Sequence, residues 1–191
     1  MALVASPLPR MSPRRLFLFS LIACLAFAGV GAPRRAQAGT ARFIPWRDAG
    51  TPPLALKDPA GAPHALADYR GKIVLVNFWA TWCDPCREEM PSMQRLKERL
   101  ADRRFAVLAV NYGESQEKVD EFLKHVPLDL QMLLDPGQET ARAWKVRILP
   151  VSFLLDAEGR VRYSVIGEID WEGPEAVNTV RRLLRSAAGA P

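Results

Sequence analysis

Two long apolar runs dominate the middle of the chain. The segments 72–80 (KIVLVNFWA) and 105–112 (FAVLAVNY) are apolar at nearly every position, which is typical of strands covered on both faces in a parallel sheet. Between them Met93, Leu96 and Leu100 recur at helical spacing and predict a helix with one buried face. The order of strand, helix and strand is typical of a β-α-β unit.

The following segment continues this alternation. Apolar residues spaced as i, i+3, i+4 and i+7 predict a second helix: Val119, Phe122, Leu123 and Val126. Residues 130–135 (LQMLLD) then predict a short strand, and 139–144 a short helix.

The C-terminal part has a different pattern. Residues 151–155 and 161–167 predict two strands joined by a polar turn near Gly159, which makes an antiparallel hairpin. A closing helix is predicted by apolar residues on one face: Val177, Val180, Leu183 and Leu184. The pattern as a whole predicts an α/β protein of three layers.

The N-terminal part divides into two segments before the folded domain, which we place at 64–191. Residues 1–38 are typical of an export signal, because arginines precede the apolar run LFLFSLIACLAFAGVGA and the tripeptide AQA at 36–38 offers a cleavage site. Residues 39–63 are rich in proline and predict an irregular or short β-hairpin lead-in that packs on the domain.

The signal segment leaves alternatives open. Arg14 and Arg15 directly before the apolar run fit the twin-arginine export route. The run of about 17 apolar residues is also long enough for a short membrane anchor, although the cleavage pattern favours removal. Cys24 lies inside this run and is interpreted as a small hydrophobic residue rather than a lipid attachment site.

The net charge of +5 comes entirely from the signal. Five of the 26 lysines and arginines lie in residues 1–38, which contain no acidic residue, so the other 21 basic residues balance the 21 acidic ones. The remaining chain has no basic excess to attract phosphate backbones, and we expect no nucleic-acid partner.

Cys83 and Cys86 are the only cysteines beyond the signal, and they are spaced as Cys-X-X-Cys. Both fall where the strand 72–80 passes into a helix, so their sulfurs lie at a helix N-terminus, where unpaired N–H groups stabilise a thiolate. The pKa of the first cysteine falls from its free value of about 8.5, while Pro85 stiffens the loop. The pair is therefore predicted to cycle between dithiol and disulfide, with no further cofactor.

Three other interpretations of the pair are weaker. A structural disulfide that closes so short a loop adds little stability. A zinc site would need two further ligands from His64 and His125, which stand outside any usual zinc spacing. A thiol peroxidase of the peroxiredoxin type carries a threonine three positions before its cysteine, where this chain has Ala80, with Thr81 one position later.

The chain from about Leu54 to Leu184 resembles the TlpA and ResA group of thioredoxin-fold thiol:disulfide oxidoreductases. The resemblance is carried by GKIVLVNFWATWCDPCREEMPSM at 71–93, FAVLAVN at 105–111 and ILPVSFLLDAEGRVRYSVIGE at 148–168. It implies a thioredoxin fold with a mixed central sheet, an N-terminal extension and a βα insertion.

The resemblance also implies roles for individual residues. Cys83 would be the attacking thiol and Cys86 the resolving thiol. Pro150 would be a cis-proline that faces the disulfide and presents the backbone of Leu149 to the substrate. Substrate would contact Trp82, Pro85, Leu149 and Pro150, while Trp79 would pack behind the disulfide.

Two polar residues stand close to the pair in the sequence. Asn77 stands where thioredoxin has a buried acid, and an amide cannot take over proton transfer. Glu89 matches a glutamate of the TlpA and ResA group and would relay the proton of Cys86, or else it is simply a favourable acid in the first helical turn. Arg87, Glu88, His64 and His125 are interpreted as surface residues, and Ser115 as the N-cap of the next helix.

These observations together predict an exported enzyme, periplasmic or in the cell envelope, that reduces disulfides of client proteins. Candidate clients are proteins of cytochrome c or copper-centre maturation, and a membrane thiol donor would re-reduce the pair. We expect a monomer. The alternatives are a thiol peroxidase and a copper-binding chaperone, although the chaperones of this fold add a histidine near the strand hairpin, where this chain has none.

Overall fold

The computed structural model describes residues 42–48, 50–101 and 104–188, so the predicted signal and Cys24 lie outside the described residues. The strands are β1 (Ile44–Pro45), β2 (Ala55–Lys57), β3 (Pro63–Ala65), β4 (Ile73–Trp79), β5 (Phe105–Tyr112), β6 (Gln131–Asp135), β7 (Val151–Leu155) and β8 (Val161–Ile166). The helices are a 3-10 turn η1 (Leu66–Tyr69), α2 (Asp84–Arg99), α3 (Gln116–His125), α4 (Glu139–Ala143) and α5 (Pro174–Ala188). No helix in the described ranges combines the length and apolar character needed to cross a membrane.

All strands belong to one mixed sheet in the order β1-β8-β7-β4-β5-β6-β2-β3. Strands β4, β5 and β6 run parallel, while β7 runs antiparallel to β4 and pairs with β8 as a hairpin. The apolar runs therefore form the parallel centre of the sheet, as predicted. Their bounds agree with the sequence prediction to within one residue at each end.

Strand β4 is apolar at nearly every position because both of its faces are covered. All of its seven residues are buried, and they alternate between the two faces of the sheet. Ile73, Leu75 and Trp79 belong to the cluster on one face, and the residues between them to the cluster on the other: Val74, Val76 and Phe78.

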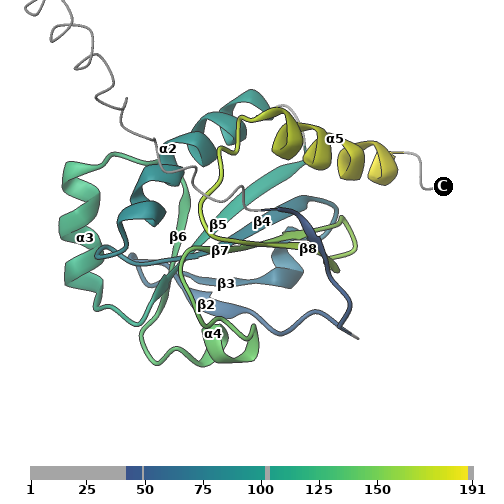
Figure 1. Cartoon of the computed structure of the whole chain (residues 1–191). Coiled ribbons are helices and arrows are strands. Elements are labelled where there is room, and N and C mark those ends of the chain that lie inside the picture. The colour runs from purple at the N-terminus through teal and green to yellow at the C-terminus, as the bar shows by residue number, and fades with distance from the viewer. Residues whose placement is uncertain (1–41, 49, 102–103, 189–191) are drawn as a thin grey trace, which may run out of the picture. The chain divides into compact units, whose positions relative to one another are not determined.

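Helices cover both faces of the sheet, which makes the three layers that the sequence predicted. Helices α2 and α5 lie above the sheet in Figure 1 and α4 lies below it. Met90, Met93 and Leu96 of α2 pack with Val177 and Val180 of α5 in one core. On the opposite face, Ala141 of α4 and Trp144 pack against β4 and β7, and the Trp144 and Phe153 rings meet at 4.9 Å between centroids.

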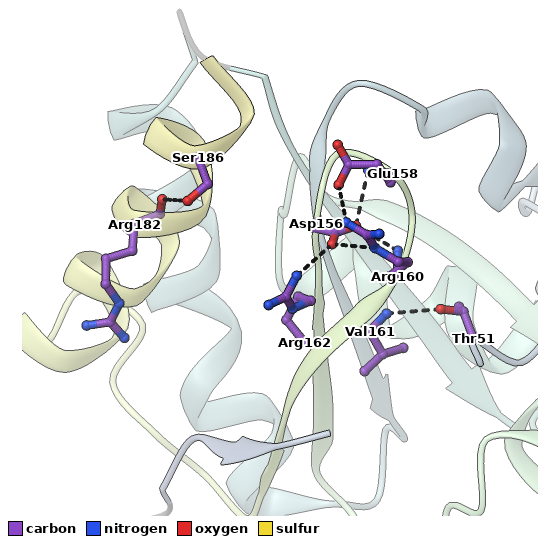
Figure 2. A network of polar contacts seen from close by, with 8 residues as sticks. All are labelled: Thr51, Asp156, Glu158, Arg160, Val161, Arg162, Arg182 and Ser186. Carbon is purple, nitrogen blue, oxygen red and sulfur yellow. Dashed lines mark hydrogen bonds and ion pairs between the residues drawn. The ribbon is translucent and has the colours of Figure 1, made fainter. Parts of the chain in front are cut away.

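The turn between β7 and β8 is held by one buried carboxylate (Figure 2). Asp156 accepts hydrogen bonds from the backbone N–H of Arg160 at 2.9 Å and from its side chain at 3.0 Å, and Arg162 approaches at 3.2 Å. Burial opposes ionisation, but these contacts outweigh it and hold the pKa of Asp156 below its usual value. The ion pairs therefore hold the turn that joins β7 to β8.

The lead-in contributes strands to both edges of the sheet. Strand β1 pairs antiparallel with β8 at one edge. Strands β2 and β3 form the expected short hairpin, which joins the other edge through the pairing of Lys57 with Leu134 of β6. Strand β3 spans the predicted boundary between residues 63 and 64, so the lead-in and the domain share one sheet.

Candidate active site

The two cysteines lie where β4 passes into α2, as the sequence predicted. Cys83 is the N-cap residue of α2, and its sulfur accepts a contact from the backbone N–H of Cys86 at 3.3 Å. The two residues are joined as a disulfide with their Cα atoms 5.3 Å apart. Cys83 is 5% exposed and Cys86 fully buried, so an incoming group meets Cys83 first. After reduction, the free N–H groups of the helix start would stabilise a thiolate on Cys83.

Glu89 lies one turn after Cys86 on the same buried face of α2, and is 2% exposed. Its Oε1 accepts a hydrogen bond from the side-chain amide of Asn77 at 2.8 Å. Its Oε2 accepts hydrogen bonds from the backbone N–H of Ile169 at 3.3 Å and from the indole N–H of Trp171 at 3.4 Å. Burial is the largest influence and raises the pKa of Glu89 to about 8, although these hydrogen bonds oppose it.

This environment separates two interpretations of Glu89. A first-turn acid that merely suits the helix dipole would lie in solvent with an ordinary pKa. Glu89 instead points into the protein from the second turn of α2, and it holds a proton at neutral pH. The group can therefore give up or take up a proton near neutral pH, one helical turn along α2 from Cys86.

Asn77 orients Glu89 rather than transferring protons itself. Its side-chain N–H groups donate both to Glu89 and to the hydroxyl of Ser152 at 2.9 Å. Ser152 stands opposite Asn77 in the antiparallel pairing of β4 and β7. Asn77 Oδ1 is buried and has no partner among the described residues. Sequence reasoning found the position of Asn77 but not this contact.

The peptide bond between Leu149 and Pro150 is cis, which confirms the prediction for Pro150. The pairing of Phe78 with Val151 places Pro150 level with the end of β4, where the chain leads to Cys83. The Pro150 carbonyl accepts a hydrogen bond from the N–H of Gly167 at 2.9 Å. Pro150 thus lies at the end of the central strands from which the active-site loop leaves the sheet.

Apolar side chains are exposed in the two loops at this end of the sheet. Trp82, predicted as a substrate contact, is 63% exposed, whereas Trp79 is fully buried, as predicted. Ile148, two residues before Pro150, is 59% exposed and was missed by sequence reasoning. The sequence feature that could have indicated its exposure is its position two residues before Pro150, because hydrophobic periodicity gives no such indication. Pro85 lies in the first turn of α2, in accord with its predicted place.

Two further residues differ from the sequence interpretation. His64 is half-buried rather than a surface residue, because its ring nitrogens contact Asp58 at 3.1 Å and Tyr69 at 3.0 Å. Glu114, which follows β5, is buried and bonded to Thr81 in the active-site loop. The motif GES at 113–115 indicated only a helix start, and Ser115 is indeed the N-cap of α3. Contacts between residues 33 positions apart leave no local signal.

The histidines make local contacts rather than a metal centre. His125 is exposed on α3 and contacts Glu121 at 3.2 Å, and His64 is held within the β2–β3 hairpin region. Across the part of the chain that the structure describes, no group of three or more His, Cys, Asp or Glu side chains is placed to hold a metal ion.

Comparison with known proteins identifies relatives with the same kind of chemistry. Residues 49–164 match the AhpC/TSA family. The thiol-disulfide oxidoreductase ResA of Geobacillus thermodenitrificans is 34% identical over 159 residues, which cover 83% of this chain and 91% of the relative.

Solved structures give the same picture. A thiol:disulfide interchange protein of the thioredoxin family from Chlorobium tepidum is 27% identical with a TM-score of 0.62, covering 75% of this chain and 98% of that one. An exposed lipoprotein thioredoxin of Streptococcus pneumoniae is 25% identical with a TM-score of 0.61, covering 69% and 99%. The chain therefore belongs to the AhpC/TSA family, as a thioredoxin-fold thiol-disulfide oxidoreductase of the ResA kind.

Proposed function

We propose that this oxidoreductase is exported and reduces disulfides of client proteins in the cell envelope. The observation that carries the proposal is the Cys83–Cys86 pair at the start of α2, with Glu89 buried one turn further along. The predicted signal at 1–38 supports export, and one relative of similar fold is described as an exposed lipoprotein.

In the proposed reaction the Cys83 thiolate attacks one sulfur of the client disulfide. A new S–S bond forms between Cys83 and the client, the client disulfide breaks, and the other client sulfur leaves as a thiolate that takes up a proton. Cys86 then loses its proton and attacks the Cys83 sulfur, which releases the second client thiol. Two electrons and two protons pass from the protein dithiol to the client disulfide.

Glu89 supports the second step by managing the proton of Cys86. Burial raises the pKa of Glu89 to about 8, so its carboxyl group can exchange a proton near neutral pH, which suits it to take up the proton that Cys86 loses. The hydrogen bond from Asn77 fixes the orientation of the carboxyl group within the core. Trp82, Leu149 and Pro150 would form the surface on which the client strand lies, with Pro85 at its border.

The oxidised pair must be re-reduced, and an oxidising envelope supplies no general reductant. We infer a membrane thiol donor for this purpose. A client with a Cys-X-X-Cys-His site in cytochrome c maturation, or a copper-centre assembly protein, fits the proposed reaction.

A thiol peroxidase is the alternative that the family description keeps open. A peroxidase of this fold needs a free threonine hydroxyl beside the attacking cysteine. Here the Thr81 hydroxyl donates to Glu114 Oε1 at 2.6 Å and is occupied. A copper chaperone would need a histidine free to bind the metal, whereas His64 is engaged by Asp58 and Tyr69. Both observations favour the reductase.

The first experiment is the redox equilibrium of the purified protein in glutathione and dithiothreitol buffers, followed by thiol content, with Cys86→Ser as the control. A two-electron couple well below the potential of glutathione supports a reductase with a dedicated donor. A potential far above that of glutathione makes the protein an oxidant and overturns the direction proposed here.

A second readout tests the attacking residue. A peptide with a disulfide-bonded Cys-X-X-Cys-His site should be trapped as a mixed disulfide on Cys83 in the Cys86→Ser protein, and Cys83→Ser should trap none. Peroxide consumption that persists in Cys86→Ser at the wild-type rate would favour the peroxidase instead.

A further inference from the structure

A buried carboxylate ties the active-site loop to the neighbouring strand. Glu114 lies between β5 and α3 and is 7% exposed. Its Oε2 accepts hydrogen bonds from the backbone N–H of Thr81 at 2.7 Å and from the side-chain amide of Asn111 at 2.9 Å. Its Oε1 accepts a hydrogen bond from the Thr81 hydroxyl at 2.6 Å. Every contact of this carboxylate is therefore with a neutral donor.

Glu114 is ionised at neutral pH despite its burial. Burial raises the pKa, but the hydrogen bonds from Thr81 and Asn111 outweigh it, with the positive charge of Lys118 adding to them, and the pKa lies below its usual value. Hydrogen bonds to a charged acceptor are shorter and stronger than neutral ones, which fits the two short contacts with Thr81.

The base of this arrangement is rigid. Asn111 is the residue of β5 that pairs with Trp79, the last residue of β4. The Asn111 side-chain oxygen also accepts a hydrogen bond from the Glu114 N–H at 3.1 Å. The carboxylate is thus fixed relative to the central sheet.

The hydrogen bonds from Thr81 to Glu114 form a tether, and its other end, Thr81, lies two residues before Cys83 of the disulfide. Thr81 stands between the end of β4 and Cys83, and the Cys83 N–H donates to the Ala80 carbonyl at 3.2 Å. The loop 80–83 is consequently held at Thr81 from β5 and at Cys83 by its own turn. Cys83 is further held as the N-cap of α2, where its carbonyl accepts a hydrogen bond from the Arg87 N–H at 3.2 Å, so Glu114 supplies the side-chain anchor at Thr81 on the other side of the loop.

We propose that Glu114 is a positioning residue, which holds Thr81 and so keeps Cys83 in the geometry needed for in-line attack on a docked client disulfide. This inference rests on the proposed role of Cys83 as the attacking thiol. A nucleophile must approach along the axis of the bond that breaks, and small displacements of it are costly in rate. If the loop could shift, Cys83 would still ionise to a thiolate, but its sulfur would less often lie in line with the client disulfide bond.

The hydrogen-bond pattern of Glu114 allows its charge and its contacts to be separated. In Glu114→Gln, the amide oxygen at the Oε2 position keeps both of its donors, Thr81 N–H and Asn111. The amide nitrogen at the Oε1 position donates to the Thr81 hydroxyl, which can accept as well as donate. This variant therefore keeps three contacts without the charge, whereas Glu114→Ala loses all three.

The test measures mixed-disulfide formation in the Cys86→Ser background of the full chain. The probe is a peptide with a disulfide-bonded Cys-X-X-Cys-His site, followed by quenched mass spectrometry across a pH series that reaches full ionisation of Cys83. At the plateau, Glu114→Ala should react about tenfold more slowly than its parent, within the cost of a misplaced nucleophile. Glu114→Gln should recover most of that loss.

Iodoacetamide and a control variant distinguish alignment from other effects. This small reagent approaches a thiolate from any open direction, so its plateau rate should stay within about twofold in all variants. The control is Glu121→Ala, which removes an exposed glutamate of α3 and should match the parent in both assays. If Glu114→Ala does not fold, Thr81→Val removes only the hydroxyl contact and should give a smaller loss of about threefold.

Two outcomes would overturn the inference. Equal peptide rates in Glu114→Ala and its parent would show that the tether does not position Cys83. A Glu114→Gln protein as slow as Glu114→Ala would show that the charge matters and the contacts do not. A separate result would contradict the proposed function. In that case the peptide would be trapped by Cys86 in a Cys83→Ser protein, and not by Cys83 in the Cys86→Ser protein.

Discussion

Replacement of Glu89 by glutamine should change how the stability of the protein depends on pH. Glutamine has nearly the same shape as glutamate but does not ionise. Glu89 has an ordinary pKa near 4.5 in the unfolded chain and about 8 in the fold. The folded protein therefore binds this proton more tightly than the unfolded chain does.

The sign and size of the effect follow from this difference. As the pH rises above 4.5, the unfolded chain loses the proton first, so ionisation of Glu89 lowers the free energy of unfolding until the pH passes the folded pKa of about 8. Each pKa unit corresponds to about 1.4 kcal/mol. Between about pH 5 and pH 7.5 the wild-type protein should lose about 3 kcal/mol relative to Glu89→Gln.

The assay is urea unfolding of both proteins with the disulfide intact, so that no thiol titrates. The free energy of unfolding is measured at several values between about pH 5 and pH 8, and the difference between the two proteins is plotted against pH. Hydrogen bonds that the amide gains or loses shift this difference by the same amount at every pH. The difference is taken as the free energy of unfolding of Glu89→Gln minus that of the wild type, and it should rise with pH. A difference that stays flat or falls as the pH rises would refute a buried and protonated Glu89.

Two other predictions concern the exposed Trp82 and the buried Asp156. Because Trp82 is 63% exposed, Trp82→Ala should change the free energy of unfolding by less than about 0.5 kcal/mol, yet raise KM for the disulfide peptide roughly tenfold; an unchanged KM in steady-state assays would remove it from the client surface. Asp156→Asn should lower the free energy of unfolding at pH 7 by roughly 1 to 2 kcal/mol, because Arg160 and Arg162 lose their anionic partner. The folded pKa of Asp156 is lowered, so this loss should shrink in urea unfolding below about pH 4, and a loss that persists there would point to packing instead.

The parts of the fold that the sequence predicted are those with a strong local signal. Strands β5 and β7 have the predicted bounds because apolar side chains fill both faces of the sheet there. Strand β1 has only two residues, and nothing in Ile44–Pro45 indicates that it pairs with β8, more than a hundred positions later. Such short strands depend on their partner and not on their own sequence.

The active site shows the same division. The cysteines and Pro150 were found because their spacing and context are specific. Glu89 could not be assigned from sequence, since the same residue suits a solvated first turn or a buried pocket. Its environment depends on Asn77 and on Trp171, which lies 82 positions away. The tether from Glu114 to Thr81 likewise depends on which loops the sheet brings together.

The short strands at the two borders of the sheet have a consequence for handling extended polypeptides. Within the described residues the sheet ends with β1 and β3, each of two or three residues and each containing a proline, Pro45 or Pro63. A proline has no N–H to offer a further strand, and a short border gives an added chain little to pair with. Both borders therefore offer an extended polypeptide little to pair with, which guards the sheet against edge-to-edge aggregation.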